Sequence, residues 1–253
     1  MQITPLGDSA LILRVRDEFE TAPEETLDAV LDTERRLATA RLPGVIELAP
    51  AYTTVALFYD PARAIEAGAP RENVFDWYEQ KIRAALASVA GVDDRGGTRH
   101  GTACTLDVPV CYEDEFAPDL ADVAQHTGLS PQQIVDLHCG SQYRVHCVGF
   151  TAAFPFLGGL PANLATPRRV TPRKEIAAGS VGIGGAQTGI YPVKSPGGWN
   201  IIGRTPLRLF NPRKNPPSLL RAGDGVRFRS ITHAEFERLT HDARSTVLSS
   251  RTK

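Results

Sequence analysis

The first third of the chain alternates short apolar runs with stretches of helical spacing. A largely apolar run at 10–15 predicts a buried strand. Thr21-Ala22-Pro23-Glu24 has the pattern of a capping box, and apolar residues at helical spacing follow it as far as Leu37. Residues 45–48 and 52–59 predict two strands, and residues 74–89 predict a second long helix. This order predicts a small α+β domain with helices on an antiparallel sheet.

The middle of the chain begins with a polar, glycine-rich segment at 91–101, which is typical of a linker. Leu106, Val108 and Val110 then alternate as a strand, which either closes the first sheet or opens a second domain. Two short helices are predicted next, the second starting at a capping box at Ser130, and residues 143–150 predict another strand.

Residues 151–231 differ in composition from the rest of the chain. They hold 12 Gly and 10 Pro, about 27 % of the segment, against about 11 % in the other 172 residues. Short β-type runs lie between these turn residues, and this pattern is typical of a compact barrel. The runs are at 181–183, 199–202, 207–210 and 226–228. Beyond His233 we expect one helical segment, with Phe236 and Leu239 at helical spacing, and then a loose Ser/Thr/Arg tail.

The ends and the cysteines indicate a cytoplasmic protein. No basic segment followed by an apolar run stands at the start, and no apolar run approaches the 18 or so residues of a membrane helix. Cys104, Cys111, Cys139 and Cys147 lack C-x-x-C spacing, so we expect reduced, buried thiols and no metal site.

Charge is unevenly distributed along the chain. The formal net charge is −1, yet residues 151–231 carry 12 Lys/Arg and two acids, which is +10, so the rest carries −11. The basic residues are dispersed and few aromatics lie among them, so we expect no nucleic-acid partner.

Common catalytic motifs do not occur, but the basic segment holds polar residues among glycines. Gly182–Gln187 superficially matches part of a dinucleotide fingerprint, but strands surround it and no helix follows. Glycines let backbone N–H groups approach a ligand, and arginine forks suit a carboxylate, phosphate or carbamoyl-like group. The alternative is that a small barrel needs Gly and Pro at its corners. The candidate polar residues are Arg168, Gln187, Tyr191, Arg204 and Thr205.

The same segment carries a series of motifs that resembles a known family. They are Phe154-Pro155-Phe156-Leu157-Gly158-Gly159-Leu160, Ala165-Thr166-Pro167-Arg168-Arg169, Gly179-Ser180-Val181-Gly182-Ile183, Gln187-Thr188-Gly189-Ile190-Tyr191-Pro192, Ser195-Pro196-Gly197-Gly198-Trp199 and Ile202-Gly203-Arg204-Thr205-Pro206. With Pro5–Ala10, Pro43–Val45, Pro50–Tyr52 and Val108–Tyr112, they cover nearly the whole chain. The chain resembles the family that contains the B subunit of bacterial 5-oxoprolinase, the kinase inhibitor KipI and allophanate hydrolase subunit 1.

The resemblance implies an α+β protein in which a small N-terminal α/β domain precedes a cyclophilin-like β-barrel. The implied organisation is a first domain at 1–92, a linker at 93–101, the barrel domain at 102–232 and a tail at 233–253. The strand at 106–110 then opens the barrel.

The resemblance also implies a function for the chain. As a non-autonomous B subunit, acting with subunits A and C of 5-oxoprolinase, it would hydrolyse 5-oxo-L-proline to L-glutamate at the expense of ATP, which the complex uses. The C subunit is implied to have a similar barrel. The implied catalytic residues are Gln187, Tyr191 and Arg204; the implied substrate-binding residues are Pro155, Arg168, Gly185, Thr188 and Thr205.

The chain departs from the family pattern at three places. The family's Pro-Gly before Phe154 is Ala152-Ala153, its Gly-Gly-Gln is Gly185-Ala186-Gln187, and its Gly-Gly-Glu-Phe-Gly is Glu113–Ala117. Each change removes a glycine that could adopt a positive φ or allow close approach.

Two alternative functions remain open on the sequence. A KipI-type inhibitor would use the barrel to bind a histidine kinase, with the acidic first domain steering the encounter. A carboxyltransferase part of urea or allophanate metabolism would need a biotin carboxylase partner, and this chain has no biotinylation motif.

Overall fold

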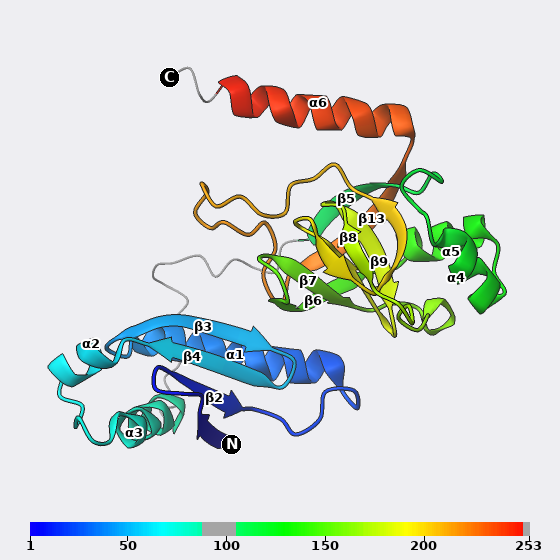
Figure 1. The fold of residues 1–253 in the computed structure, drawn as a ribbon. Coiled ribbons are helices and arrows are strands. Elements are labelled where there is room, and N and C mark those ends of the chain that lie inside the picture. Colours follow the sequence, from blue (N-terminus) through cyan, green and yellow to red (C-terminus); the bar gives the residue numbers. More distant parts are fainter. Residues whose placement is uncertain (88–104, 250–253) are drawn as a thin grey trace. The chain divides into compact units, whose positions relative to one another are not determined.

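The computed structural model describes residues 1–87 and 105–249 (Figure 1), and it divides the chain into two compact units, Met1–Thr102 and Ala103–Lys253. Each unit has a hydrophobic core of its own. The predicted linker at 93–101 lies outside the described residues. Within the described ranges, no helix is long and apolar enough to cross a membrane.

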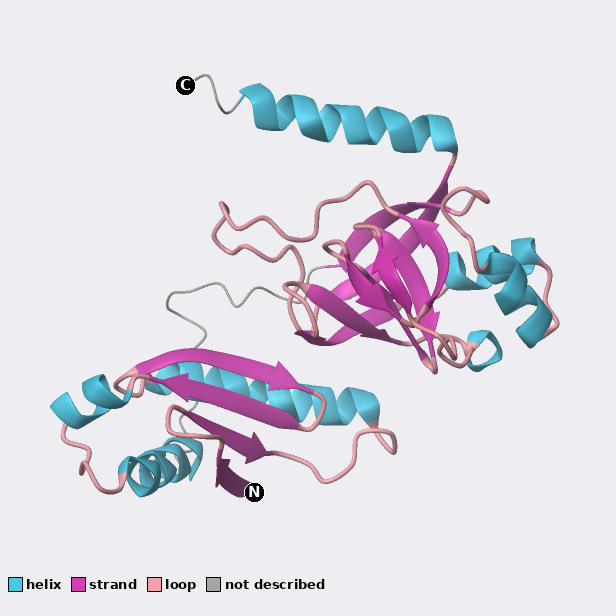
Figure 2. Ribbon diagram, viewed as in Figure 1, coloured by secondary structure: helices cyan, strands magenta, loops and turns pink. Residues whose placement is uncertain are grey.

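The first unit is a four-stranded antiparallel sheet with helices packed on it (Figure 2). Its strands, in sheet order, are β1 (Gln2–Pro5), β2 (Ala10–Arg14), β4 (Thr54–Tyr59) and β3 (Val45–Ala51). Helix α1 (Pro23–Ala40) packs on β3 and β4 and against α3 (Val74–Ala87). The buried Leu27, Val30 and Leu37 of α1 lie at the predicted helical spacing.

Three local predictions in this unit need correction. Thr21 does not cap α1: the N-cap is Ala22, with no side-chain hydrogen bond, and the Thr21 hydroxyl donates to Glu18 instead. Strand β1 was not predicted. Only one of its four residues is buried, so the segment shows no alternation of apolar and polar positions. Helix α2 (Pro61–Glu66) was also not predicted; Asp60 caps it by accepting from the backbone N–H groups of Ala62 and Arg63.

The second unit is a closed barrel. Seven strands of the described chain follow the order β6-β13-β5-β12-β9-β10-β7, and β7 pairs back onto β6. β13 pairs with β5 in parallel, and the other neighbouring strands are antiparallel. The predicted strand at 106–110 is the first strand of this barrel along the chain. The strands are β5 (Thr105–Cys111), β6 (Tyr143–Gly149), β7 (Phe154–Gly158), β9 (Ser180–Gly184), β10 (Gln187–Ile190), β12 (Asn200–Arg204) and β13 (Gly225–Ile231).

Smaller elements surround the barrel. Helices α4 (Leu120–Thr127) and α5 (Pro131–Gly140) connect β5 to β6, and the predicted capping box of Ser130 with Gln133 is present. A single 3₁₀ turn, η1 (Ala162–Leu164), precedes a two-stranded ribbon of β8 (Arg173–Ile176) and β11 (Ser195–Gly197).

Two predictions for the second unit are wrong. Residues 207–210 do not form a strand; only Phe210 makes an isolated bridge, to Ser218, because Pro206, Pro212 and the prolines at 216–217 cannot donate to a ladder. The helix predicted after β13 is present as α6 (His233–Ser249), but it includes most of the Ser/Thr/Arg segment that was expected to be loose. Its buried Phe236 packs with Cys111, Phe116 and Ile231.

Candidate functional site

A layer of aromatic side chains covers part of the outer face of the barrel. Successive residues of a strand point to opposite faces, and Leu157 of β7 and Ile202 of β12 lie in the barrel core. Their neighbours Phe156 and Ile201 belong to a second cluster, which we call the aromatic layer. The layer consists of Phe154, Phe156, Ile176, Tyr191, Trp199 and Ile201.

Glycines of the barrel strands and of the β8–β11 ribbon explain how the side chains of this layer fit. A Cβ at Gly184 would lie 2.5 Å from the indole nitrogen of Trp199, and one at Gly189 would lie 3.0 Å from the Phe154 ring. A Cβ at Gly197 would lie 2.3 Å from the Tyr191 hydroxyl oxygen. These glycines therefore make room for the protein's own rings, whereas Gly185 and Gly198 of the adjoining loops leave open or ordinary space.

Arg168 lies at the exposed side of the aromatic layer. Its guanidinium carbon is 5.9 Å from the centre of the Trp199 ring, within the range of a cation–π contact. Among the residues that the structure describes, no carboxylate forms an ion pair with Arg168. The Arg168 side chain is exposed.

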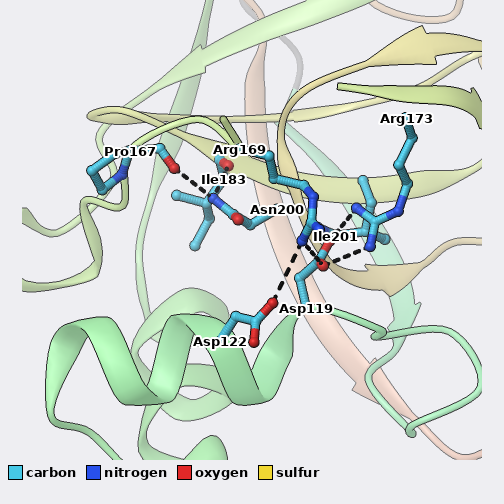
Figure 3. A network of polar contacts seen from close by, with 8 residues as sticks. All are labelled: Asp119, Asp122, Pro167, Arg169, Arg173, Ile183, Asn200 and Ile201. Atoms are coloured by element: carbon cyan, nitrogen blue, oxygen red, sulfur yellow. Dashed lines mark hydrogen bonds and ion pairs between the residues drawn. The ribbon is translucent and has the colours of Figure 1, made fainter. Parts of the chain in front are cut away.

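A buried carboxylate holds the segment that carries Arg168 (Figure 3). Asp119, at the start of α4, is 1 % exposed and accepts hydrogen bonds from the guanidinium groups of Arg169 and Arg173 and from the backbone N–H of Ile201. The hydrogen bond to Asp119 raises the pKa of Arg173. We call Asp119, Arg169 and Arg173 the arginine clamp.

Sequence reasoning missed the arginine clamp. Asp119 is 50 and 54 positions from its two arginine partners, so no local pattern connects them. The pairing is therefore visible only in the folded chain.

Tyr191 is a buried member of the aromatic layer. Its side chain is 1 % exposed and touches the Phe154 ring edge-on. Burial raises the pKa of the Tyr191 hydroxyl, and the nearby charges of Arg168 and Arg173 offset part of that rise. The structure thus brings Arg168 and Tyr191 into one neighbourhood.

Gly185 and Gln187 lie at the β9–β10 turn. Gly185 has a φ of +66°, and it exchanges two backbone hydrogen bonds with Thr166, in the segment before Arg168. Gln187 begins β10, is half-buried, and pairs with Gly184, which lies under Trp199. Both positions therefore adjoin the Arg168 and Trp199 neighbourhood.

Arg204 and Thr205 lie at the other end of β9. Arg204 pairs with Ser180 and Gln187 with Gly184, so their positions are four residues apart along the strand, roughly 13 Å. The Arg204 guanidinium lies over Phe116, 5.4 Å from the ring centre. Thr205 is buried and accepts from the backbone N–H of Leu207.

Thr188 belongs to a hydrogen-bonded chain inside the second unit. Its hydroxyl donates to the carbonyl of Gly182 and therefore accepts from Nε2–H of His138, 3.0 Å away. Nδ1 of His138 then accepts from the Tyr112 hydroxyl at 2.7 Å. Burial lowers the pKa of His138 to about 3, so this histidine is neutral. Pro155 is likewise buried, in β7 opposite Val148.

The described part of the chain contains no cluster of side chains suited to bind a metal ion. In residues 1–87 and 105–249, no group of three or more His, Cys, Asp or Glu side chains is placed to hold a metal ion. Cys111, Cys139 and Cys147 are free thiols, and burial raises the pKa of each.

Comparison with known proteins gives a consistent family. The family described as "Carboxyltransferase domain, subdomain C and D" matches residues 1–220. The chain is 40 % identical to the B subunit of 5-oxoprolinase from Bacillus subtilis, over 93 % of this chain and 95 % of that protein. It is 54 % identical to the B subunit of 5-oxoprolinase from Escherichia coli O157:H7 over 49 % of this chain, a match that spans 56 % of the relative.

Solved structures agree with this assignment. The protein TTHA0988 matches with a TM-score of 0.69 and 32 % identity over 88 % of this chain, and the match spans 40 % of that longer chain. The urea amidolyase of K. lactis, at 17 % identity and a TM-score of 0.68, shares the fold; the match covers 95 % of this chain and 15 % of that one. The family resemblance and the barrel prediction are therefore confirmed: the chain belongs to the carboxyltransferase-domain family that includes the B subunit of 5-oxoprolinase.

Proposed function

We propose that this chain is the B subunit of an ATP-dependent 5-oxoprolinase and acts with subunits A and C to hydrolyse 5-oxo-L-proline to L-glutamate. The observation that carries this proposal is the likeness to the Bacillus subtilis B subunit, which extends over 95 % of that protein. This coverage matters because a match over 93 % of the present chain extends into both the first unit and the barrel unit.

The geometry at the aromatic layer suits the proposed substrate. 5-Oxoproline is a small ring with a carboxylate, and a guanidinium recognises a carboxylate through charge-assisted hydrogen bonds. Arg168 supplies an exposed guanidinium over Trp199, and Gln187 lies at the adjoining turn with an amide that matches the donors and acceptors of a lactam. We therefore assign Arg168 to the substrate carboxylate and Gln187 to the lactam.

The remaining predicted residues take different places in this proposal. Tyr191 and Thr188 are buried: the Tyr191 ring packs on Phe154 and its hydroxyl is hydrogen-bonded to the backbone of Trp199, and Thr188 holds the interior of the barrel. Gly185 keeps Thr166 in place through two backbone hydrogen bonds. Arg204 ends β12 and Thr205 follows it. Arg204 remains a proposed catalytic residue, for a reacting group that lies at this end of the strand.

ATP would supply the phosphoryl group that makes the unreactive lactam carbonyl susceptible to water. The chain's own contribution to that step is electrostatic: fixed cationic groups such as Arg168 and Arg204 stabilise negative charge that develops on the substrate. We assign the ATP site to no residue of this chain.

Reconstitution tests the proposed function. The chain is co-expressed with candidate subunits A and C, and glutamate release is measured with 5-oxoproline and ATP, omitting each component in turn. We expect glutamate only when all components are present. A complex that assembles but releases no more glutamate than the mixture lacking this chain would contradict the proposal, and binding to a histidine kinase would then favour the inhibitor.

Arg168→Gln tests the assignment of the substrate carboxylate. Loss of a charge-assisted hydrogen bond is worth about 1.5–3 kcal/mol, so we expect the KM for 5-oxoproline to rise about 10- to 100-fold. Arg213→Gln is the matched control, because Arg213 is another exposed arginine of the same basic segment. Equal KM values for the two variants would exclude this role for Arg168.

A further inference from the structure

The backbone on both sides of Arg168 is fixed to the segment that carries Trp199. The carbonyl of Pro167 accepts from the Asn200 side-chain amide at 2.8 Å (Figure 3), and the N–H of Arg169 donates to the Gly198 carbonyl at 2.7 Å. These partners flank Trp199 in sequence. Arg168 and the ring beneath it are therefore held in register by bonds that leave the Arg168 side chain exposed.

The arginine clamp adds an ionic anchor to this arrangement. Asp119 lies 2.5 Å from Nη1 of Arg169 and 2.6 and 2.7 Å from the two terminal nitrogens of Arg173. It also accepts from the N–H of Ile201 at 2.6 Å, so one carboxylate joins α4, the 165–172 segment, β8 and β12. Loss of this buried carboxylate would leave the Arg173 guanidinium without its ion-pair partner and Arg169 with only the 3.5 Å contact to the exposed Asp122.

The three arginines consequently have different roles. Asp119 neutralises part of the charge of Arg169 and Arg173 and holds both side chains against α4, whereas the Arg168 side chain is exposed and lies over Trp199. Arg169 is only 31 % exposed and Arg173 29 % exposed. A ligand that approaches Trp199 therefore meets the guanidinium of Arg168 first.

We propose that Asp119 is a positioning residue, which acts through Arg169 and Arg173 to hold Arg168 over Trp199 in the orientation that binds the carboxylate of the substrate. This role rests on the proposed function. Asp119 itself does not touch the substrate, since four donors of the protein already surround its buried carboxylate.

A double-mutant cycle in the assembled enzyme tests this role. Asp119→Asn, Arg168→Gln and the double variant are compared with the wild type by the KM and kcat for 5-oxoproline. We expect Asp119→Asn to raise KM about 10-fold with kcat within about threefold, and to add less than about twofold in the Arg168→Gln background. Asp119→Glu, which keeps the charge, should recover part of the lost affinity.

Two further variants keep the result interpretable. Asp136→Asn is the matched control, because Asp136 is an exposed aspartate of the neighbouring helix α5, and its KM should equal that of the wild type. If Asp119→Asn does not fold, Arg169→Lys replaces it in the cycle, since lysine keeps the charge and loses the fork geometry.

The outcomes separate the positioning role from the proposed function. A wild-type complex that releases no glutamate refutes both. An active wild type in which the KM effects of Asp119→Asn and Arg168→Gln multiply independently, or in which Asp119→Asn changes thermal stability but not KM, overturns the positioning role alone.

Discussion

At the residue scale, the three departures from the family pattern have unequal structural consequences. Ala153 adopts a φ of +67° in the turn between β6 and β7, where the family has glycine. Ala186 and Ala117 are not among the described non-glycine residues with a positive φ. Only the loss of glycine at 153 therefore leaves a side chain in the left-handed region, which costs roughly 1–2 kcal/mol.

Restoring the glycine should stabilise the barrel unit. Ala153→Gly relieves the left-handed strain but adds about 0.5–1 kcal/mol of unfolded-state entropy, so we expect a net gain of about 0.5–1 kcal/mol and a Tm higher by about 1–3 °C. Calorimetry of the purified chain measures this shift. Ala186→Gly should give no gain, and a lower Tm for Ala153→Gly would show that the buried methyl group outweighs the strain.

At the element scale, two similar sequence patterns have different outcomes. Thr21-x-x-Glu24 and Ser130-x-x-Gln133 both fit a capping box, yet only the second forms one. The Ser130 hydroxyl accepts from the N–H of Gln133, and the Gln133 side chain accepts from the N–H of Ser130. At the start of α1, the chain enters one residue later, at Ala22, so the Thr21 hydroxyl points to Glu18.

This difference predicts unequal effects of the same substitution. Ser130→Ala should lower the free energy of unfolding of the barrel unit by about 1 kcal/mol, because it removes an N-cap. Thr21→Ala should change stability by less than about 0.5 kcal/mol, as is usual for an exposed surface position. Urea denaturation, with hydrogen exchange of the α5 and α1 amides, distinguishes the two. Equal losses for both variants would contradict the observed capping.

The glycine-rich strands show why element prediction was incomplete. Strands β7 and β10 contain Pro155 and Gly189, residues with low strand propensity, so local patterns did not indicate them. Position 189 must be glycine because the Phe154 ring lies against it and leaves little room for a side chain. The residues that stabilise such a strand lie far from it in the sequence. Intrinsic strand propensity, which depends on the residue alone, therefore does not predict it.

At the scale of the whole molecule, a buried neutral histidine couples the stability of the second unit to pH. His138 is fully buried, stacks on Phe228, and joins α5 to β10 through Thr188. Its pKa in the folded protein is about 3, below the 6.5 of the unfolded chain. The unfolded state therefore takes up a proton below pH 6.5 and the folded state does not, so stability falls as pH drops from 6.5 towards 3.

We expect His138 to contribute a loss of about 2 kcal/mol between pH 7.5 and pH 5, at about 1.4 kcal/mol per pH unit below 6.5. Urea denaturation of the wild type and His138→Gln at both pH values measures the difference. NMR of the imidazole provides a check that does not depend on the variant folding: the ring should remain the neutral Nε2–H tautomer throughout. A ring that titrates near pH 6 would refute the prediction.

The uneven charge also has a structural meaning at this scale. The basic segment 151–231 carries +10, yet Arg169 and Arg173 are paired with Asp119, which lies outside that segment. Further pairs join Arg227 to Asp107 and Arg229 to Glu235. Part of the positive charge of the segment is thus neutralised by acidic residues that lie outside it.

The family, the barrel and the residue types at the candidate site could be predicted from the sequence, because they follow from ordered motifs and from local hydrophobic and turn patterns. The folded chain was needed to show that Trp199 and Phe154 pack against Gly184 and Gly189, that Tyr191 is buried, and that Asp119 pairs with Arg169 and Arg173. Those contacts join residues that lie far apart along the chain. Barrel closure brings them together, and no local pattern of the sequence encodes that geometry.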